Sequence, residues 1–217
     1  MAVERQHAES VHTRLTARSL NSGGTRGNEL LTSLTGCVLI ALLAVIGVTI
    51  ISLTRLLWIH LFVGMLLIGP VVLKLSSTGY RFFRYYTANP RYRRKGPPPL
   101  ALRLIAPIVV VTTLVVFASG VALLFIGPSS RDTLLPIHKV SFFVWLAFTA
   151  IHVLAHLPTI AGALRSEYPA SSTRSSATAG RAGRALSLTA ALTAGVVLAV
   201  VVIPQFAPWI SSQRFHH

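Results

Sequence analysis

The chain has 217 residues, of which 53% are hydrophobic and 12% are charged, and its formal net charge is +15. Ordinary soluble domains carry about a quarter charged residues. A soluble nucleic-acid binder this basic would gather its lysines and arginines on a water-facing patch, whereas long uncharged segments separate the basic clusters of this chain. The composition therefore excludes most soluble classes, predicts no nucleic-acid partner, and indicates a polytopic membrane protein in contact with membrane lipid.

Five segments are long and apolar enough to cross a hydrocarbon core about 30 Å thick, which takes roughly 20 residues of α-helix. We therefore predict an all-α membrane bundle of five transmembrane helices. The single cysteine, Cys37, excludes an intrachain disulfide and is expected to be a small packing residue. The predicted spans are residues 31–52, 55–77, 103–127, 134–159 and 187–208.

The segments outside the spans are polar. Residues 1–29 and 161–186 are rich in small and polar residues without helical periodicity, which predicts a disordered basic tail and a flexible linker. Helices one to four then form one unit over residues 30–160. Residues 187–217 hold the fifth helix and a short outer tail.

The basic residues predict the orientation of the bundle. Fifteen lie in the N-terminal tail and in the segments after the second and fourth spans, whereas four lie at the opposite ends of the spans. Because short loops rich in Lys and Arg stay in the cytoplasm, we expect a cytoplasmic N-terminus and an outer C-terminus. The four outer basic residues are Arg55, Arg131, Lys139 and Arg214.

Residues 80–99, which follow the second span, interleave tyrosines and phenylalanines with arginines and end in three prolines. Three interpretations are open. The segment can be an interfacial aromatic belt that contacts anionic lipid, a docking site for a cytoplasmic partner, or a binder of single-stranded nucleic acid. The first is favoured.

Four of the eight histidines lie inside the predicted spans. An ionisable side chain in a span costs free energy and marks a functional site by default, although a single histidine can simply hydrogen-bond a neighbouring helix. They are His60 in the second span and His138, His152 and His156 in the fourth.

Helical geometry indicates how these histidines can be used. At 3.6 residues per turn, the three on the fourth span share one face, and a rise of about 1.5 Å per residue puts His152 roughly 21 Å below His138. That separation is typical of one helix that supplies ligands to two haems stacked across a membrane. His60 and His138 lie at similar depths, within about 5 Å by the same rise. Since imidazoles suit iron and bundles hold such cofactors between facing helices, we predict an outer haem b site within a four-helix haem-binding core.

Neighbours of the outer pair fit this prediction. Gly64, one turn below His60, would let a flat macrocycle approach the helix backbone. Arg55, Arg131 and Lys139 lie within two turns of His60 or His138 in sequence and can pair with haem propionates. They can equally be ordinary interfacial anchors.

An inner site is also open. His152 and His156 are four residues apart, a spacing that suits two ligands on one metal ion, but they cannot hold one haem from opposite sides. Lys74 follows His60 by 14 residues, as His152 follows His138. A deprotonated amine of Lys74 can complete an inner iron site, or the side chain can reach the cytoplasmic headgroups.

At WIHLFVGMLLIGPVVLKL (58–75) and LPIHKVSFFVWLAFTAIHVLAHL (135–157), the chain resembles bacterial membrane cytochromes b. These cytochromes belong to the cytochrome b561-like group, which includes the gamma subunits of formate dehydrogenase. The resemblance covers roughly residues 53–160. It implies a location in the bacterial inner membrane and electron transfer between a quinone pool and a partner redox protein, through one or two non-covalent haems b. Such a chain is an electron-transfer subunit of an oxidoreductase and not a self-contained enzyme.

The resemblance implies that His60 and His138 are the axial ligands. The chain departs from the group because a complete second His–His pair is missing, so either one haem binds or Lys74 or a partner chain completes the second site. Two other functions stay open. One is a metal-ion transporter or sensor that uses His152 and His156 with His60, although no acidic residue accompanies the break at Gly69–Pro70 in span two. The other is a structural membrane anchor.

Overall fold

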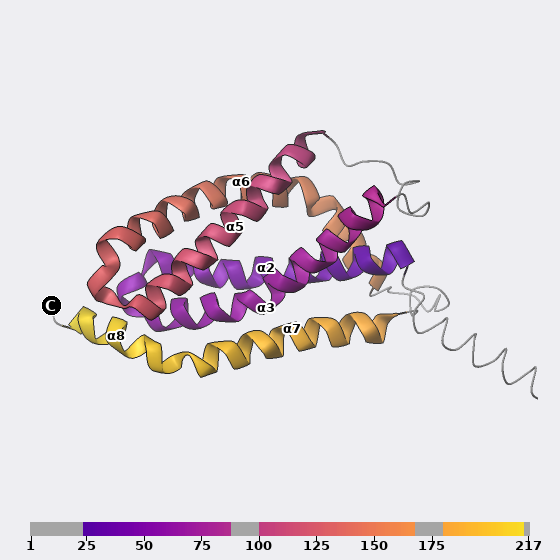
Figure 1. The fold of residues 1–217 in the computed structure, drawn as a ribbon. Coiled ribbons are helices and arrows are strands. Elements are labelled where there is room, and N and C mark those ends of the chain that lie inside the picture. The colour runs from indigo at the N-terminus through magenta and orange to yellow at the C-terminus, as the bar shows by residue number, and fades with distance from the viewer. Residues whose placement is uncertain (1–23, 88–99, 168–179, 215–217) are drawn as a thin grey trace, which may run out of the picture.

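The computed structural model describes residues 24–87, 100–167 and 180–214. In these ranges the chain is helical and has no strand, which confirms the predicted all-α class (Figure 1). Five of the helices are long and apolar enough to cross a membrane. They are α2 (Gly24–Ile51), α3 (Leu53–Tyr86), α5 (Leu100–Ile126), α6 (Arg131–Glu167) and α7 (Arg181–Val201); the shorter elements are η1 (Pro128–Ser130), η2 (Ile203–Phe206) and α8 (Ala207–Arg214).

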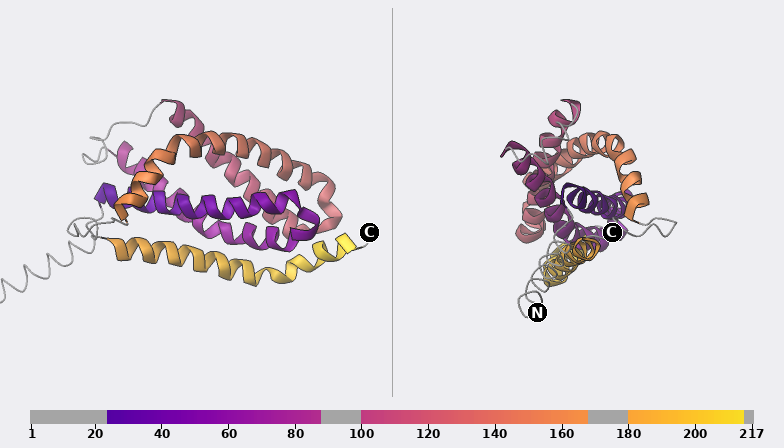
Figure 2. Two further views of the ribbon diagram at one scale, coloured as in Figure 1. Left: turned by 180° about the vertical axis from the view of Figure 1, so that it is seen from behind. Right: turned by 90° about the vertical axis from the view of Figure 1, so that its right-hand side faces the viewer.

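The long helices run side by side in alternating directions. In Figure 1, α2 and α3 lie between the α5–α6 hairpin on one side and α7 on the other, and Figure 2 shows the same order from behind. α2, α5 and α7 begin at the end of the bundle where α3 and α6 end. We call this the basic end, because the basic tail and both basic linkers join the helices there. The opposite end carries α8.

Several helices are longer than hydropathy predicted. α2 begins at Gly24, inside the predicted tail, and α3 continues past residue 77 to Tyr86. Helices also occupy both ends of the predicted linker at residues 161–186. The difference arises because apolar content marks the part of a helix inside the lipid, whereas the helix itself can continue through polar residues until a cap or proline ends it. The rest of the predicted tail and linker lies outside the described residues.

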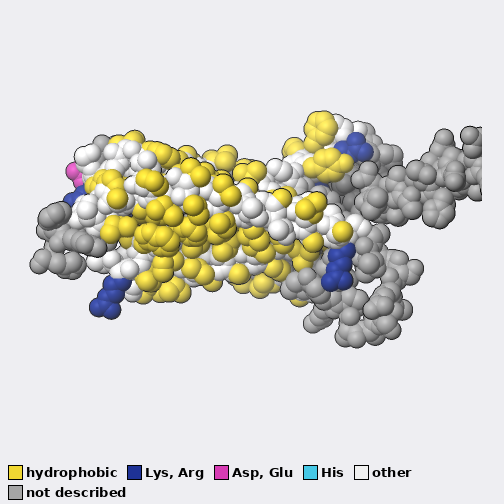
Figure 3. All heavy atoms as spheres, turned by 90° about the horizontal axis from the view of Figure 1, so that it is seen from below, with side chains coloured by type: hydrophobic (Ala, Val, Ile, Leu, Met, Phe, Trp, Pro, Cys, Tyr) yellow, Lys and Arg dark blue, Asp and Glu magenta, His cyan; other side chains and the backbone are white. Residues whose placement is uncertain are grey.

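The surface is that of a membrane protein. Hydrophobic side chains cover the middle of the face in Figure 3, and Lys and Arg side chains lie near its two ends. α6 is the least buried of the five long helices, and many of its apolar side chains are exposed, including Val140 and Phe143. Exposed apolar residues at this density suit a lipid environment. The chain is therefore a multi-pass membrane protein.

The buried core lies where α3, α5 and α7 meet. α3 packs extensively against both α2 and α7, and α5 packs against α6. The predicted unit contained only helices one to four, but the fifth helix is part of this core. The main buried cluster consists of Met65, Leu124, Ala199, Val202 and Phe206.

Two glycines bring α3 and α7 into backbone contact. A Cβ atom on Gly69 of α3 would overlap the carbonyl oxygen of Ala191, and one on Gly195 of α7 would overlap the carbonyl oxygen of Leu66. Small residues at such crossings let membrane helices approach closely and gain van der Waals contact. This contact fixes α7 against the helix that carries His60.

Candidate functional site

His60 lies on α3 and contacts α2. Its Nδ1 atom is 2.9 Å from the hydroxyl oxygen of Thr49, and that hydroxyl donates to the carbonyl oxygen of Ile46 at 2.7 Å. A hydroxyl has a single hydrogen, so Thr49 has none left to give and must accept one from His60. Nδ1 therefore carries the imidazole hydrogen, and Nε2 has a free lone pair.

His138 lies on α6 and is held in the same way by α5. Its Nδ1 atom is 3.1 Å from the carbonyl oxygen of Val116 and 3.1 Å from the hydroxyl oxygen of Ser119. A carbonyl oxygen can only accept a hydrogen bond, and Ser119 donates its own hydrogen to Val116 at 3.0 Å. Nδ1 of His138 must therefore be the donor, which again leaves the lone pair on Nε2.

The pairing of His60 with His138 on one iron stays a prediction. Their side chains are close enough to interact electrostatically, and both are half-buried. The fixed Nδ1–H is what metal-ligating histidines use, because an acceptor on one ring nitrogen orients the ring and makes the other nitrogen more basic. Four helices contribute to the pair: α3 and α6 carry the imidazoles, while α2 and α5 hold them.

Two glycines leave space beside this pair. A Cβ atom on Gly120 of α5 would lie 3.1 Å from Cε1 of His138, so the imidazole rests directly on the α5 backbone. No heavy atom lies within 4 Å of the Cβ position of Gly64, one turn from His60. The donor type, the fixed tautomers and the open backbone at Gly64 all fit an axially ligated haem.

The three basic residues predicted to lie near the propionates are all exposed: Arg55, Arg131 and Lys139. Nε of Arg131 is 3.9 Å from a carboxylate oxygen of Asp132. They lie at the same end of the bundle as the outer pair, near the start of α3 and the start of α6. Their pairing with propionates stays a prediction.

The inner histidines differ from the outer pair. The rings of His152 and His156 lie side by side on α6, with centroids 4.7 Å apart and planes inclined at 55°. Nδ1 of His152 is buried and has no hydrogen-bond partner among the described residues, and the same holds for the hydroxyl of Thr149 one turn away. Nothing in the described part of the chain therefore fixes the tautomer of His152.

Lys74 joins α3 to α2. Its amine donates a hydrogen bond of 2.7 Å to the carbonyl oxygen of Thr32, so it points into the bundle and not to the headgroups. It interacts electrostatically with His152 and His156, but the hydrogen bond described for its amine goes to α2. Ligation of iron by Lys74 stays a prediction, and the structure gives this residue a tethering contact instead.

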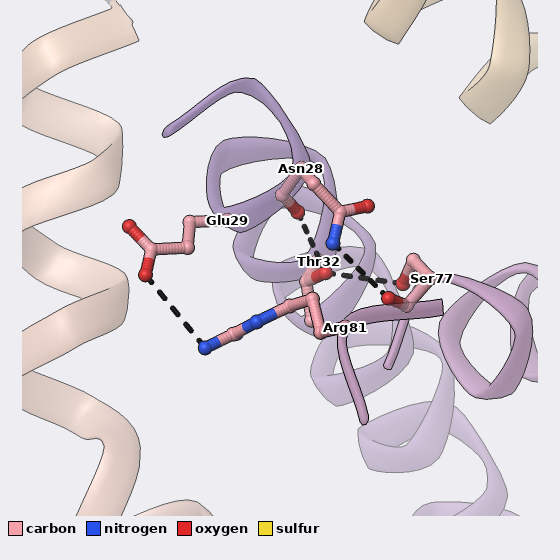
Figure 4. A network of polar contacts seen from close by, with 5 residues as sticks. All are labelled: Asn28, Glu29, Thr32, Ser77 and Arg81. Atoms are coloured by element: carbon pink, nitrogen blue, oxygen red, sulfur yellow. Dashed lines mark hydrogen bonds and ion pairs between the residues drawn. The ribbon is translucent and has the colours of Figure 1, made fainter. Parts of the chain in front are cut away.

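A polar network surrounds this tether at the basic end of α2 and α3 (Figure 4). The side-chain amide of Asn28 donates to the carbonyl oxygen of Ser77 at 3.1 Å. The hydroxyl of Thr32 bonds the carbonyl oxygen of Asn28 at 2.7 Å and lies 3.1 Å from the hydroxyl of Ser77. Arg81 and Glu29 form an ion pair at 3.7 Å. These contacts join the first turns of α2 to the last turns of α3.

The residues described here contain no cluster of three or more His, Cys, Asp or Glu side chains with metal-binding spacing. Cys37 forms no disulfide and is half-buried, as expected for a packing residue.

The hydrogen-bond partners of the two outer histidines were not predicted from the sequence. A signal for one of them exists, because Ser119 and His138 lie equally far from the turn at Gly127–Ser130. Residues placed symmetrically about a tight helical hairpin share the same depth, so Ser119 could have been matched to His138. No such symmetry links Thr49, two residues before the end of α2, to His60, seven residues after the start of α3.

Comparison of the chain with protein-family models, with curated proteins and with solved structures finds no match, and its function is therefore inferred from its own residues and their contacts.

Proposed function

We propose that the protein is an integral membrane cytochrome b that carries electrons across the bilayer through one haem b ligated by His60 and His138. The observation that carries the proposal is the pair of fixed tautomers. Both imidazoles donate from Nδ1 to an acceptor on a neighbouring helix, and both keep the Nε2 lone pair for a ligand. Two histidines that are held in this way on two helices, within electrostatic range of each other, are what an iron site with two axial imidazoles requires.

The chain would supply position and electrostatics, while bound haem b would supply a one-electron carrier. His60 and His138 would act as axial ligands from two helices. Thr49 and the Val116–Ser119 pair would hold the ring planes, and the backbone at Gly64 would admit the flat edge of the macrocycle. Arg55, Arg131 and Lys139 would be the candidate partners of the propionates.

We propose further that this site passes electrons between a quinone pool and a partner redox protein, as the resemblance of residues 53–160 to bacterial membrane cytochromes b implies. Under this proposal the chain is a subunit of an oxidoreductase in the bacterial inner membrane, with its basic end in the cytoplasm. The excess of Lys and Arg at that end supports the orientation. The outer pair then lies toward the opposite surface.

A difference spectrum tests the proposal. Protein purified from haem-replete cells should show the alpha band of a b-type haem when dithionite-reduced, and a pyridine haemochrome assay should give one haem per chain. A featureless spectrum would exclude the cytochrome function. In that case, a metal ion that stays bound through purification would favour the transporter or sensor. Protein that contains neither haem nor metal would favour the structural anchor. Two haems per chain would show that the inner histidines also bind iron.

Removing the hydroxyl that holds His60 should weaken haem binding without removing a ligand. We expect Thr49→Val to lower haem affinity by about 10- to 100-fold, the usual range for the loss of a hydrogen bond to a metal-ligating histidine. Titration of the haem-free protein in detergent with hemin measures the change. Thr112→Val is the matched control, because the Thr112 hydroxyl bonds only carbonyl oxygens of its own helix. Equal affinities in the two variants would contradict the assigned role of Thr49.

A further inference from the structure

The last turns of α3 extend beyond the hydrocarbon layer. The helix has 34 residues, or about 51 Å at a rise of 1.5 Å per residue, whereas the hydrocarbon core is about 30 Å thick. Since α3 begins at the opposite surface with Leu53, its turns after Lys74 lie in the headgroup layer. Arg81 and Arg84 are in these turns.

Positive charge accumulates at this level from two helices, α3 and α7. Arg81 and Arg84 come from α3, and Arg184 comes from the first turn of α7, where it is only 6% exposed. The guanidinium of Arg184 lies beside the first turns of α2, with Nη1 3.8 Å from the Cβ position of Gly27. The acidic side chain described in this network is Glu29, which pairs with Arg81. Cationic groups therefore outnumber the described carboxylate.

Arg84 has an unused donor. Its Nε atom is buried and has no hydrogen-bond partner among the described residues. A buried polar N–H without a partner costs free energy and is normally satisfied by protein, water or a bound ligand. An anionic oxygen placed here would satisfy this N–H and lower the repulsion among the arginines.

Exposed aromatic rings flank the same turns. Phe82, Phe83 and Tyr86 are 65%, 64% and 67% exposed, and aromatic residues are enriched at the headgroup level of membranes. Apolar rings beside arginines offer contacts both to an anionic headgroup and to the upper part of its acyl chains. A free inorganic anion would use only the arginines.

We propose that the basic end of the bundle, around Arg84 and Arg81 of α3, binds the headgroup of an anionic membrane phospholipid. The complementary charge, the orphaned Arg84 N–H and the flanking rings converge on this class of ligand. Basic sites between transmembrane helices on the cytoplasmic side commonly hold such headgroups. The inference is independent of haem binding, because none of its residues belongs to the outer histidine pair.

Native mass spectrometry of the detergent-purified full chain tests the site. With phosphatidylglycerol or phosphatidylcholine added at equal concentration, the wild-type protein should retain the anionic lipid several-fold more strongly. Arg84→Gln should reduce this preference about fivefold, the effect expected for one arginine near an anionic headgroup. Arg55→Gln removes the same charge from an exposed site at the other end of the bundle and should leave the preference unchanged.

Two further results decide the proposal. Glu29→Gln frees Arg81 from its ion pair and should raise retention of phosphatidylglycerol, which a merely structural role of the pair would not do. Equal retention of the two lipids by the wild-type protein would overturn the proposal. An equal loss in Arg84→Gln and Arg55→Gln would overturn it too, because the effect would then reflect net charge and not a site.

Discussion

His60→Ala and His138→Ala are each expected to remove nearly all haem from the purified protein. The two imidazoles are proposed to bind the same iron, so either substitution leaves one axial position without a ligand and a half-buried site without its donor. The loss should exceed the roughly 10- to 100-fold expected when only the supporting hydrogen bond is removed. The ratio of pyridine haemochrome to protein measures it.

The inner histidines provide the matched control for this experiment. His152→Ala and His156→Ala make the same change on the same helix as His138. Nδ1 of His152 has no hydrogen-bond partner among the described residues, unlike Nδ1 of His138. Both variants should keep the wild-type haem content and elute as folded protein. If they lose haem while His60→Ala and His138→Ala retain it, the assignment of the ligands to the outer pair is wrong.

The architecture was predictable because lipid imposes a simple rule on a sequence. Each span must be apolar for about 20 residues and must satisfy its backbone hydrogen bonds internally, so hydropathy found all five helices. It placed their ends poorly. The end of α3 illustrates why: residues 78–86 are polar or aromatic, and the helix continues through them in a region where apolar content no longer reports on helix formation.

The outer pair was predictable in part. The helical rise placed His60 and His138 at similar depth, and the structure places their side chains within electrostatic range. The fixed tautomers were not predicted, because they depend on hydroxyls and a carbonyl of the two partner helices. For Lys74, ligation of iron stays a prediction. Its hydrogen bond to the carbonyl oxygen of Thr32 on α2 was not predicted, because sequence spacing does not specify which neighbouring helix a long side chain meets.

The place of α7 could not be read from the sequence analysis. The flexible linker predicted at residues 161–186 led to its separation from helices one to four, yet its backbone lies directly against that of α3. The relevant pattern is one of small residues four apart, Ala191, Gly195 and Ala199, of which the first two lie against Gly69. Such a pattern predicts helix contact in membranes, but one helix alone does not identify its partner.

Gly69→Ala and Gly195→Ala are expected to destabilise the protein, although Gly→Ala inside a helix normally stabilises it by roughly 0.5–1 kcal/mol. At these two positions the added methyl group would meet the backbone of the facing helix, which cannot move aside as a flexible side chain can. Overpacking of this kind typically costs about 1–3 kcal/mol. The helices must then separate and lose the contacts that join α3 to α7.

Gly47→Ala controls for helix propensity, because no heavy atom lies within 4 Å of its Cβ position on α2. Thermal unfolding in detergent, followed by circular dichroism, should give a lower Tm for both crossing variants and an equal or higher Tm for Gly47→Ala. The sign of the change in Tm is decisive. Helix propensity should raise the Tm at all three glycines, and only the close contact between α3 and α7 can lower it. If Gly69→Ala and Gly195→Ala are as stable as Gly47→Ala, then α7 does not pack on α3 through these glycines, and the core around Ala199 and Phe206 must form differently.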